Sequence, residues 1–164
     1  MSSALLGAFT AFHVAISLVG IIAGFVVVFN MLGGTAGKGW TATFLWTTLA
    51  TSVTGFMFPF NGFTPAVGTG IVALIVMVPT LIAIYGKKLA GLWRPTYVIG
   101  AVISLYLNFF VLIVQSFLKI PALNVLAPTQ KEPPFAIAQG LALMLFVGLG
   151  IAAVRKFRPA ALPV

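Results

Sequence analysis

The sequence predicts an all-α membrane protein, a single bundle of five transmembrane helices, and three observations lead to this prediction. Hydrophobic residues make up 61% of the 164 residues and charged residues only 6%, whereas a soluble domain carries about 25% charged residues. Five long apolar runs follow one another along the chain, and each is close to the roughly 20 residues that a spanning helix needs. Glycine and proline are concentrated in the breaks between these runs, where they favour turns.

The five apolar runs are predicted to be membrane-spanning helices, and together they make the whole chain, residues 1–164, one transmembrane domain. They cover residues 5–32, 40–60, 66–86, 97–118 and 135–154. Strands of a membrane barrel would be about ten residues long with alternating polarity, whereas these runs are longer and continuously apolar. A four-span arrangement would require one run to be re-entrant. The first run lacks the basic start of a cleaved signal peptide, so we expect it to be retained.

Two proline features are expected to shape the bundle. Pro79 lies inside the third run, where a proline should kink the helix. Four prolines lie in the long loop at residues 119–135. Because proline fixes its own backbone and restricts the residue before it, we expect this loop to be stiff and extended.

The basic residues predict the orientation. Five spans place one set of loops and the C-terminus on one face, with Lys38, Lys87, Lys88, Arg94, Arg155, Lys156 and Arg158. The other face has only Lys119 and Lys131, beside the single acidic residue, Glu132. Since cytoplasmic loops carry the excess of Lys and Arg, the N-terminus is predicted outside and the C-terminus inside.

The same basic residues indicate what the cytoplasmic face contacts. The net charge of +8 does not indicate nucleic-acid binding, because the charges lie between apolar runs instead of forming a stripe on a soluble surface. We expect anionic lipid headgroups to contact six of them. These six are Lys87, Lys88, Arg94, Arg155, Lys156 and Arg158.

Small and polar residues recur at helical spacing and predict the inward faces, since membrane helices associate through close packing and polar contacts. Gly20, Gly24 and Gly100 are predicted packing positions. The polar residues of four helices are expected to gather in the outer half of the bundle, with Glu132 as a titratable residue in the outer loop. This predicted polar cluster consists of His13, Ser17, Thr54, Asn108, Gln115 and Gln139.

His13 is the only histidine, and two interpretations compete for it. It bonds to the other polar residues and fixes helix packing, or it carries protons or ions across the membrane. One histidine, one glutamate and no cysteine cannot supply the three or four ligands of a zinc site, so no metal site is predicted. A single haem with His13 and a non-histidine ligand, or a ring of His13 side chains in an oligomer, stays open.

Catalytic residues are not predicted. Only His13 and Glu132 could form the pair of poised groups that general acid–base catalysis usually needs. The chain has no phosphate-binding glycine loop with its lysine and no serine triad. An enzyme is therefore the third interpretation, after the two classes described below.

Three stretches carry a resemblance. TSVTGFMFPF, SLYLNFFVLIVQSFLK and PALNVLAPTQKEPPF resemble a family of small, uncharacterised bacterial integral membrane proteins with no assigned activity. The resemblance extends over most of the chain. It implies a multi-pass protein of the bacterial inner membrane and implies no chemistry.

Two function classes follow from these observations. We expect an accessory or structural subunit that packs with itself or with a larger membrane complex and contacts membrane lipid. No cofactor is required, although a lipid or a quinone-like molecule would suit such a bundle. The alternative is a homo-oligomeric channel or small transporter that uses the polar residues around His13, although paired repeats with broken helices, usual in transporters, are not visible.

Overall fold

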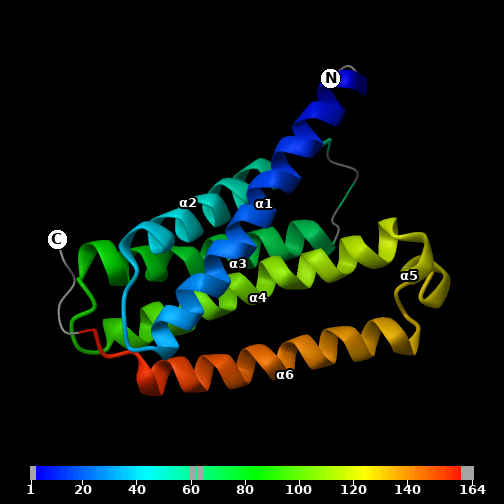
Figure 1. Ribbon diagram of the computed structural model, residues 1–164. Helices are drawn as coiled ribbons and strands as arrows, with labels where there is room; N and C mark the ends of the chain where they lie inside the picture. Colours follow the sequence, from blue (N-terminus) through cyan, green and yellow to red (C-terminus); the bar gives the residue numbers. More distant parts are fainter. Residues whose placement is uncertain (1–2, 60–61, 63–64, 160–164) are drawn as a thin grey trace.

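Every regular element of the computed structural model is a helix within the part of the chain that it describes, residues 3–59, 62 and 65–159 (Figure 1). The predicted all-α class is confirmed for these residues. Four segments are long and apolar enough to cross a bilayer, which indicates a membrane protein. They are α1 (Ser3–Leu32), the segment Val67–Gly86, α4 (Trp93–Lys119) and α6 (Pro133–Lys156).

The second predicted span, residues 40–60, corresponds to α2 (Lys38–Gly55), which is shorter than predicted and is not one of the four. Six of its 18 residues are threonines, which lowers its hydropathy. The helix stops at Gly55 because the next residues form a tight turn, in which Phe56 N–H donates to the Val53 carbonyl at 3.1 Å. Residue 60, the predicted end, lies outside the described residues.

The third predicted span contains two kinds of helix. α3 (Pro65–Leu81) includes Pro79 and passes directly into η1 (Ile82–Gly86), a π-helical turn. Pro79 has no N–H to donate to the preceding turn, and π-turns are one recognised cause of irregular helix geometry. The helix is therefore irregular near Pro79, as a widened π-turn that begins at Ile82, three residues after the proline.

The loop at residues 119–135 was predicted to be extended. It instead contains a short helix, α5 (Pro121–Leu126). Pro121 occupies the first turn, where the missing N–H has no helical partner to lose. Two side chains tie the segment to the end of α4: Asn124 Nδ2 donates to the Phe117 carbonyl at 3.1 Å, and Gln130 Nε2 to the Val114 carbonyl at 2.8 Å. These hydrogen bonds hold the segment compactly against α4, where the prolines had predicted an extended loop.

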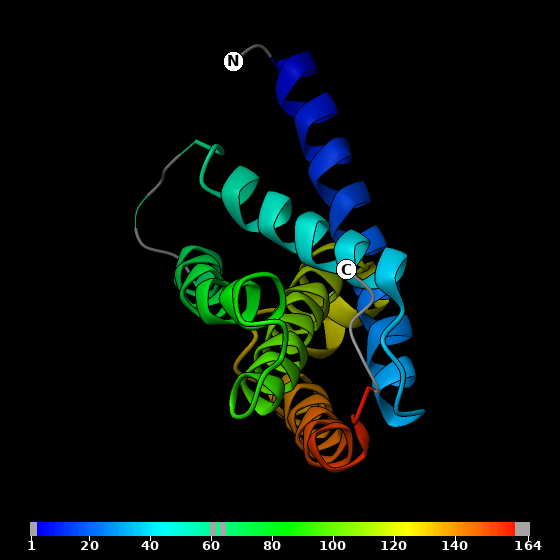
Figure 2. The same ribbon diagram turned by 90° about the vertical axis from the view of Figure 1, so that its left-hand side faces the viewer.

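α4 is the central helix of the bundle. It contacts α1, α2, α3 and α6, and Figure 2 shows these helices around it. α1 packs along α2 and crosses α4, while its first turns project beyond the other helices (Figures 1 and 2). Successive long helices run in opposite directions, so the bundle has two ends. We call them the basic end, where η1 and α6 finish and α4 begins, and the α5 end.

The three predicted packing glycines lie at helix crossings. A Cβ on Gly20 would lie 3.0 Å from Thr47 Oγ1 of α2, and one on Gly24 would lie 2.5 Å from Leu105 Cδ1 of α4. A Cβ on Gly100 would collide with Thr80 Oγ1 of α3. Each crossing thus depends on the missing side chain, as expected for helices that associate by close backbone approach.

The core lies between the basic end and the middle of the bundle. Its fully buried side chains are mainly large and apolar and come from α1, α2, α3 and α4. They include Val28, Met31, Phe44, Leu45, Met77, Tyr97, Val98 and Leu105. Most large apolar residues of α6 are exposed instead, which suits a helix whose outer face meets lipid.

Candidate functional site

A cavity of about 590 Å³ lies between α1, α2, α3 and α4, towards the α5 end. We call it the polar cavity because side chains able to form hydrogen bonds lie on its wall beside apolar ones. The polar lining includes Thr10, His13, Ser17, Asn108, Gln115 and Lys119. The apolar lining includes Leu18, Ile21, Val67, Ala73, Leu107 and Val111. Its size lies within the roughly 300–1,000 Å³ of ordinary ligand pockets.

His13 is held on the wall of the polar cavity by α2. Its Nδ1 lies 2.8 Å from Thr54 Oγ1, and the Phe58 ring meets the imidazole edge-on with ring centres 5.1 Å apart. Thr54 Oγ1 in turn donates to the Ala50 carbonyl at 2.7 Å. Two of the predicted cluster residues, 41 positions apart in sequence, are therefore in direct contact.

Ser17 lies one turn further along α1 and continues the same polar strip. Its hydroxyl donates to the His13 carbonyl at 2.7 Å and lies 3.4 Å from Thr51 Oγ1. Satisfying a serine hydroxyl on its own helix is common in apolar surroundings. Ser17 therefore costs little to bury and leaves the strip polar.

α4 supplies the opposite wall of the polar cavity. Asn108 Nδ2 donates to Thr48 Oγ1 of α2 at 3.0 Å, so Asn108 joins α4 to α2 as well as lining the cavity. Gln115 lines the cavity two turns away, and within the described residues no hydrogen bond holds its side chain. Gln115 is thus a half-buried amide available to a bound molecule.

Gln139 is not brought into the polar cavity, although the sequence grouped it with His13. It lies on α6, where its Nε2 donates to the Phe110 carbonyl of α4 at 3.2 Å. Its Oε1 is buried without a partner among the described residues. Because α6 packs on a different side of α4 from the cavity helices, helical spacing alone could not reveal this separation.

Glu132 is also apart from His13. It precedes α6, and its carboxylate accepts hydrogen bonds from the Thr129 hydroxyl at 2.8 Å and from the Lys131 N–H at 3.1 Å. The cavity lining does not include it. The one conceivable acid–base pair of the sequence is therefore not assembled in this structure.

We expect Glu132 to titrate below the usual range for glutamate. The Thr129 hydroxyl, followed by nearby backbone N–H groups, favours the charged carboxylate and lowers the pKa of Glu132. A depressed pKa means that the turn is stabilised above the ordinary pKa and loses this stabilisation as the pH falls through the lower value. Because Glu132 is the only acidic side chain, carbon-13 labelling of glutamate can follow its carboxyl by NMR.

Thr129→Val is the matching variant for this titration. It removes the hydroxyl donor and should raise the Glu132 midpoint towards the ordinary value. Thr96→Val serves as the control, because the Thr96 hydroxyl donates to the Leu92 carbonyl far along the chain. An unchanged midpoint in Thr129→Val would contradict the prediction.

The predicted headgroup-contact residues gather at the basic end. Lys87, Lys88, Arg155, Lys156 and Arg158 are exposed there. Arg94 is different, because its guanidinium donates to the Val154 carbonyl at 3.3 Å and to the Phe157 carbonyl. It thereby joins the start of α4 to the end of α6, a role that sequence alone does not indicate.

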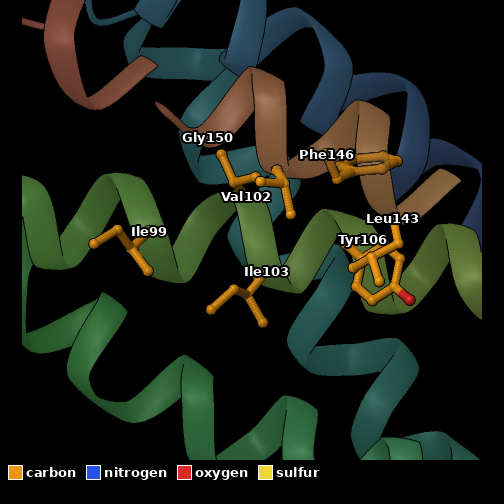
Figure 3. A pocket seen from close by; sticks show the side chains of 8 residues that line it. Ile99, Val102, Ile103, Tyr106, Leu143, Phe146 and Gly150 are labelled. Carbon is orange, nitrogen blue, oxygen red and sulfur yellow. The ribbon is translucent and has the colours of Figure 1, made fainter. Parts of the chain in front are cut away.

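A second, smaller hollow of about 190 Å³ lies between α4 and α6 (Figure 3). Figure 3 shows Ile99, Val102 and Ile103 of α4 lining it from one side. Leu143 and Phe146 of α6 lie opposite. Its lining is almost entirely apolar, so it offers contact area to an acyl chain and no chemistry.

Several lining residues of the polar cavity were not singled out from sequence. Thr51 and Ser52 belong to the threonine-rich α2, and the Ser52 hydroxyl donates to the Thr48 carbonyl of its own helix. Lys119 was counted only as a loop charge. It lies four residues after Gln115, about one helical turn, and this spacing could have placed both on one face of α4.

Comparison with protein-family models, with curated proteins and with solved structures found no match.

Proposed function

We propose that this chain is an accessory subunit of the bacterial inner membrane, without catalytic activity of its own, that holds an amphipathic molecule in the polar cavity. The bound molecule is a lipid or a quinone-like compound. The observation that carries the proposal is the composition of the cavity wall, where His13, Asn108 and Gln115 lie beside apolar side chains. Pockets for such molecules are mainly apolar with a few well-placed polar groups.

We further propose five crossings, with α2 as the second, the N-terminus outside and the C-terminus in the cytoplasm. The alternating directions of α1, α2, α3, α4 and α6 support this arrangement. The gathering of exposed Lys and Arg at the basic end supports its orientation, because such residues accumulate on the cytoplasmic side. These side chains would contact anionic lipid headgroups. The resemblance to small bacterial membrane proteins supports the same location.

Association with itself or with a larger membrane complex belongs to the same proposal. α6 exposes large apolar residues along most of its length, among them Ile137, Leu141, Met144 and Ile151. Such a face can meet either lipid or another helix. A partner helix would find the groove of Figure 3 beside it.

The channel or transporter alternative has less support. The polar cavity lies towards the α5 end, while fully buried Phe44, Leu45 and Leu105 fill the bundle towards the basic end. A conducting path within one chain would have to pass through these side chains. A path between copies of the chain would avoid them, so the oligomeric state bears directly on this alternative.

Val111→Trp tests the proposal by filling the polar cavity. The wild-type protein, isolated in a mild detergent and examined by native mass spectrometry, should carry a bound amphiphile, and Val111→Trp should lose most of it. The bulky indole occupies the space that the ligand needs. Ile103→Trp is the matched control, because it makes the same kind of change on the same helix but in the α4–α6 groove.

Two results would contradict the proposal. Wild-type protein without any bound amphiphile in repeated gentle preparations would argue against a ligand. Equal loss in both tryptophan variants would show that the mass belongs to surface lipid. Thermal unfolding of each variant checks that both remain folded.

A further inference from the structure

We propose that the polar cavity selects an amphiphile whose headgroup carries a hydroxyl, such as a quinol, a phenol or a lipid alcohol, over one whose headgroup only accepts hydrogen bonds. This inference rests on the proposed function and names the chemistry of its ligand. It follows from which nitrogen of His13 carries the proton in the neutral ring.

Thr54 fixes that proton. Its Oγ1 lies 2.7 Å from the Ala50 carbonyl and 3.2 Å from the Thr51 carbonyl, and neither carbonyl oxygen can donate. The Thr54 hydroxyl hydrogen must therefore lie between Oγ1 and one of these oxygens, since two oxygens this close without a hydrogen would repel. Oγ1 is left as an acceptor towards His13, and the 2.8 Å contact requires a proton on Nδ1.

The consequence falls on the other ring nitrogen. A neutral imidazole has one N–H, and the proton on Nδ1 makes Nε2 an acceptor. Within the described residues no hydrogen bond to Nε2 is made, and His13 lines the polar cavity. A headgroup hydroxyl can donate to Nε2, whereas a quinone carbonyl, an ester or an ether cannot.

The rest of the wall suits a headgroup at this position followed by an apolar tail. Phe58 packs edge-on against His13, and Phe56 also lines the cavity, so the wall that holds the acceptor includes aromatic rings. Along α4 the lining extends from Leu107 to Lys119, which at about 1.5 Å per residue is roughly 18 Å. This length accommodates an alkyl chain of moderate size beside Leu107 and Val111. Gln115 can both donate to and accept from a second headgroup oxygen.

The first experiment reads the proton position directly. His13 is the only histidine, so nitrogen-15 labelling of histidine in protein embedded in phosphatidylcholine nanodiscs gives the two signals of one ring. At a pH where the ring is neutral, we expect Nδ1 to be the protonated nitrogen and Nε2 the unprotonated one. The opposite tautomer would overturn the inference.

The second experiment adds matched probes to the same nanodiscs. In 4-octylanisole, the methyl ether of 4-octylphenol, a methyl group replaces the hydroxyl hydrogen, so the ether cannot donate a hydrogen bond. Empty nanodiscs correct for partitioning of the probes into lipid. We expect the phenol to bind about ten-fold more tightly, the effect of one hydrogen bond to an otherwise unpaired acceptor. It should also shift the Nε2 signal in the direction of an accepted hydrogen bond, and the ether should leave that signal unchanged.

1-Decanol separates the possible sources of the hydroxyl. Binding as tight as that of 4-octylphenol supports a lipid alcohol, and weaker binding supports a phenol or quinol. Equal binding of the phenol and the ether would overturn the hydroxyl preference while leaving the proposed function standing. Binding of none of the three probes would instead contradict the proposed function.

Thr54→Val provides the control on mechanism. It removes the acceptor that fixes Nδ1–H, so both tautomers become populated and the preference for phenol over ether should shrink. Thr43→Val makes the same change on α2, at a threonine outside the cavity lining whose hydroxyl donates only to the Gly39 carbonyl, and should preserve the preference. A preference unchanged in Thr54→Val would contradict the role assigned to Thr54.

Discussion

Gly100→Ala is expected to destabilise the bundle by about 1–3 kcal/mol, the usual range for forcing an extra methyl group into a packed core. The added Cβ would collide with Oγ1 of Thr80, a residue that is completely buried and bonded to the Val76 carbonyl at 2.7 Å. Neither side can yield easily, because α3 and α4 would have to move apart. Equilibrium unfolding in mixed micelles with rising sodium dodecyl sulfate measures the difference.

Gly140→Ala is the matched control for this prediction. Gly140 is also a glycine inside a long helix, but a Cβ there would meet nothing within 4 Å. Because alanine favours helices more than glycine, this variant should be neutral or slightly stabilised. The double variant Gly100→Ala/Thr80→Ala should recover part of the loss, since it removes the colliding hydroxyl. Equal effects of Gly100→Ala and Gly140→Ala would show that the crossing is not tight.

Arg94→Met is expected to cost about 2–3 kcal/mol and to loosen the end of α6. The guanidinium donates to two main-chain carbonyls in the last turn of that helix and just beyond it, Val154 and Phe157. Hydrogen bonds from a charged donor contribute about 1.5–3 kcal/mol, and a positive charge at a helix C-terminus adds to this. Methionine keeps an unbranched apolar stem but donates nothing.

Amide hydrogen exchange locates the effect of Arg94→Met. The Phe157 N–H, which donates to the Ala153 carbonyl at 2.8 Å, should exchange faster, whereas amides in the middle of α6 should change little. Arg155→Met is the control, because Arg155 is exposed and carries the same charge directly after Val154 in the sequence. If the two variants lose equal stability, the hydrogen bonds from Arg94 to the two carbonyls do not contribute to the free energy of unfolding beyond the effect of its charge.

Much of the fold follows from sequence because the bilayer imposes simple rules. Apolar run lengths place four of the long helices within a few residues of their observed bounds, and the all-helical class follows from the same runs. The end of α2 was missed because apolar Phe56, Met57 and Phe58 continue the run in the sequence although they form a turn in the structure. α5 was missed because Pro121 can begin a helix as well as interrupt one.

For the candidate site, the sequence predicted which residues share a face of one helix but not which helices bring their residues together. Spacing within one helix identified His13 and Ser17 on α1 and Asn108 and Gln115 on α4, all of which line the polar cavity. Spacing does not say which faces of different helices meet. The His13–Thr54 and Asn108–Thr48 contacts, and the separate position of Gln139 beside Phe110, depend on how the helices pack.

The threonines of α2 have a consequence for how the protein enters the membrane. In the five-crossing arrangement that we propose, α2 is the least apolar crossing, and its lateral exit from the translocon would be unfavourable by itself. The hydroxyls of Thr43, Thr47 and Thr54 are internally bonded to backbone carbonyls, which reduces the penalty, and α1 packs along the helix. α2 is therefore expected to insert as a hairpin with α1, so a chain with a damaged α1 would fail during biogenesis and not merely unfold afterwards.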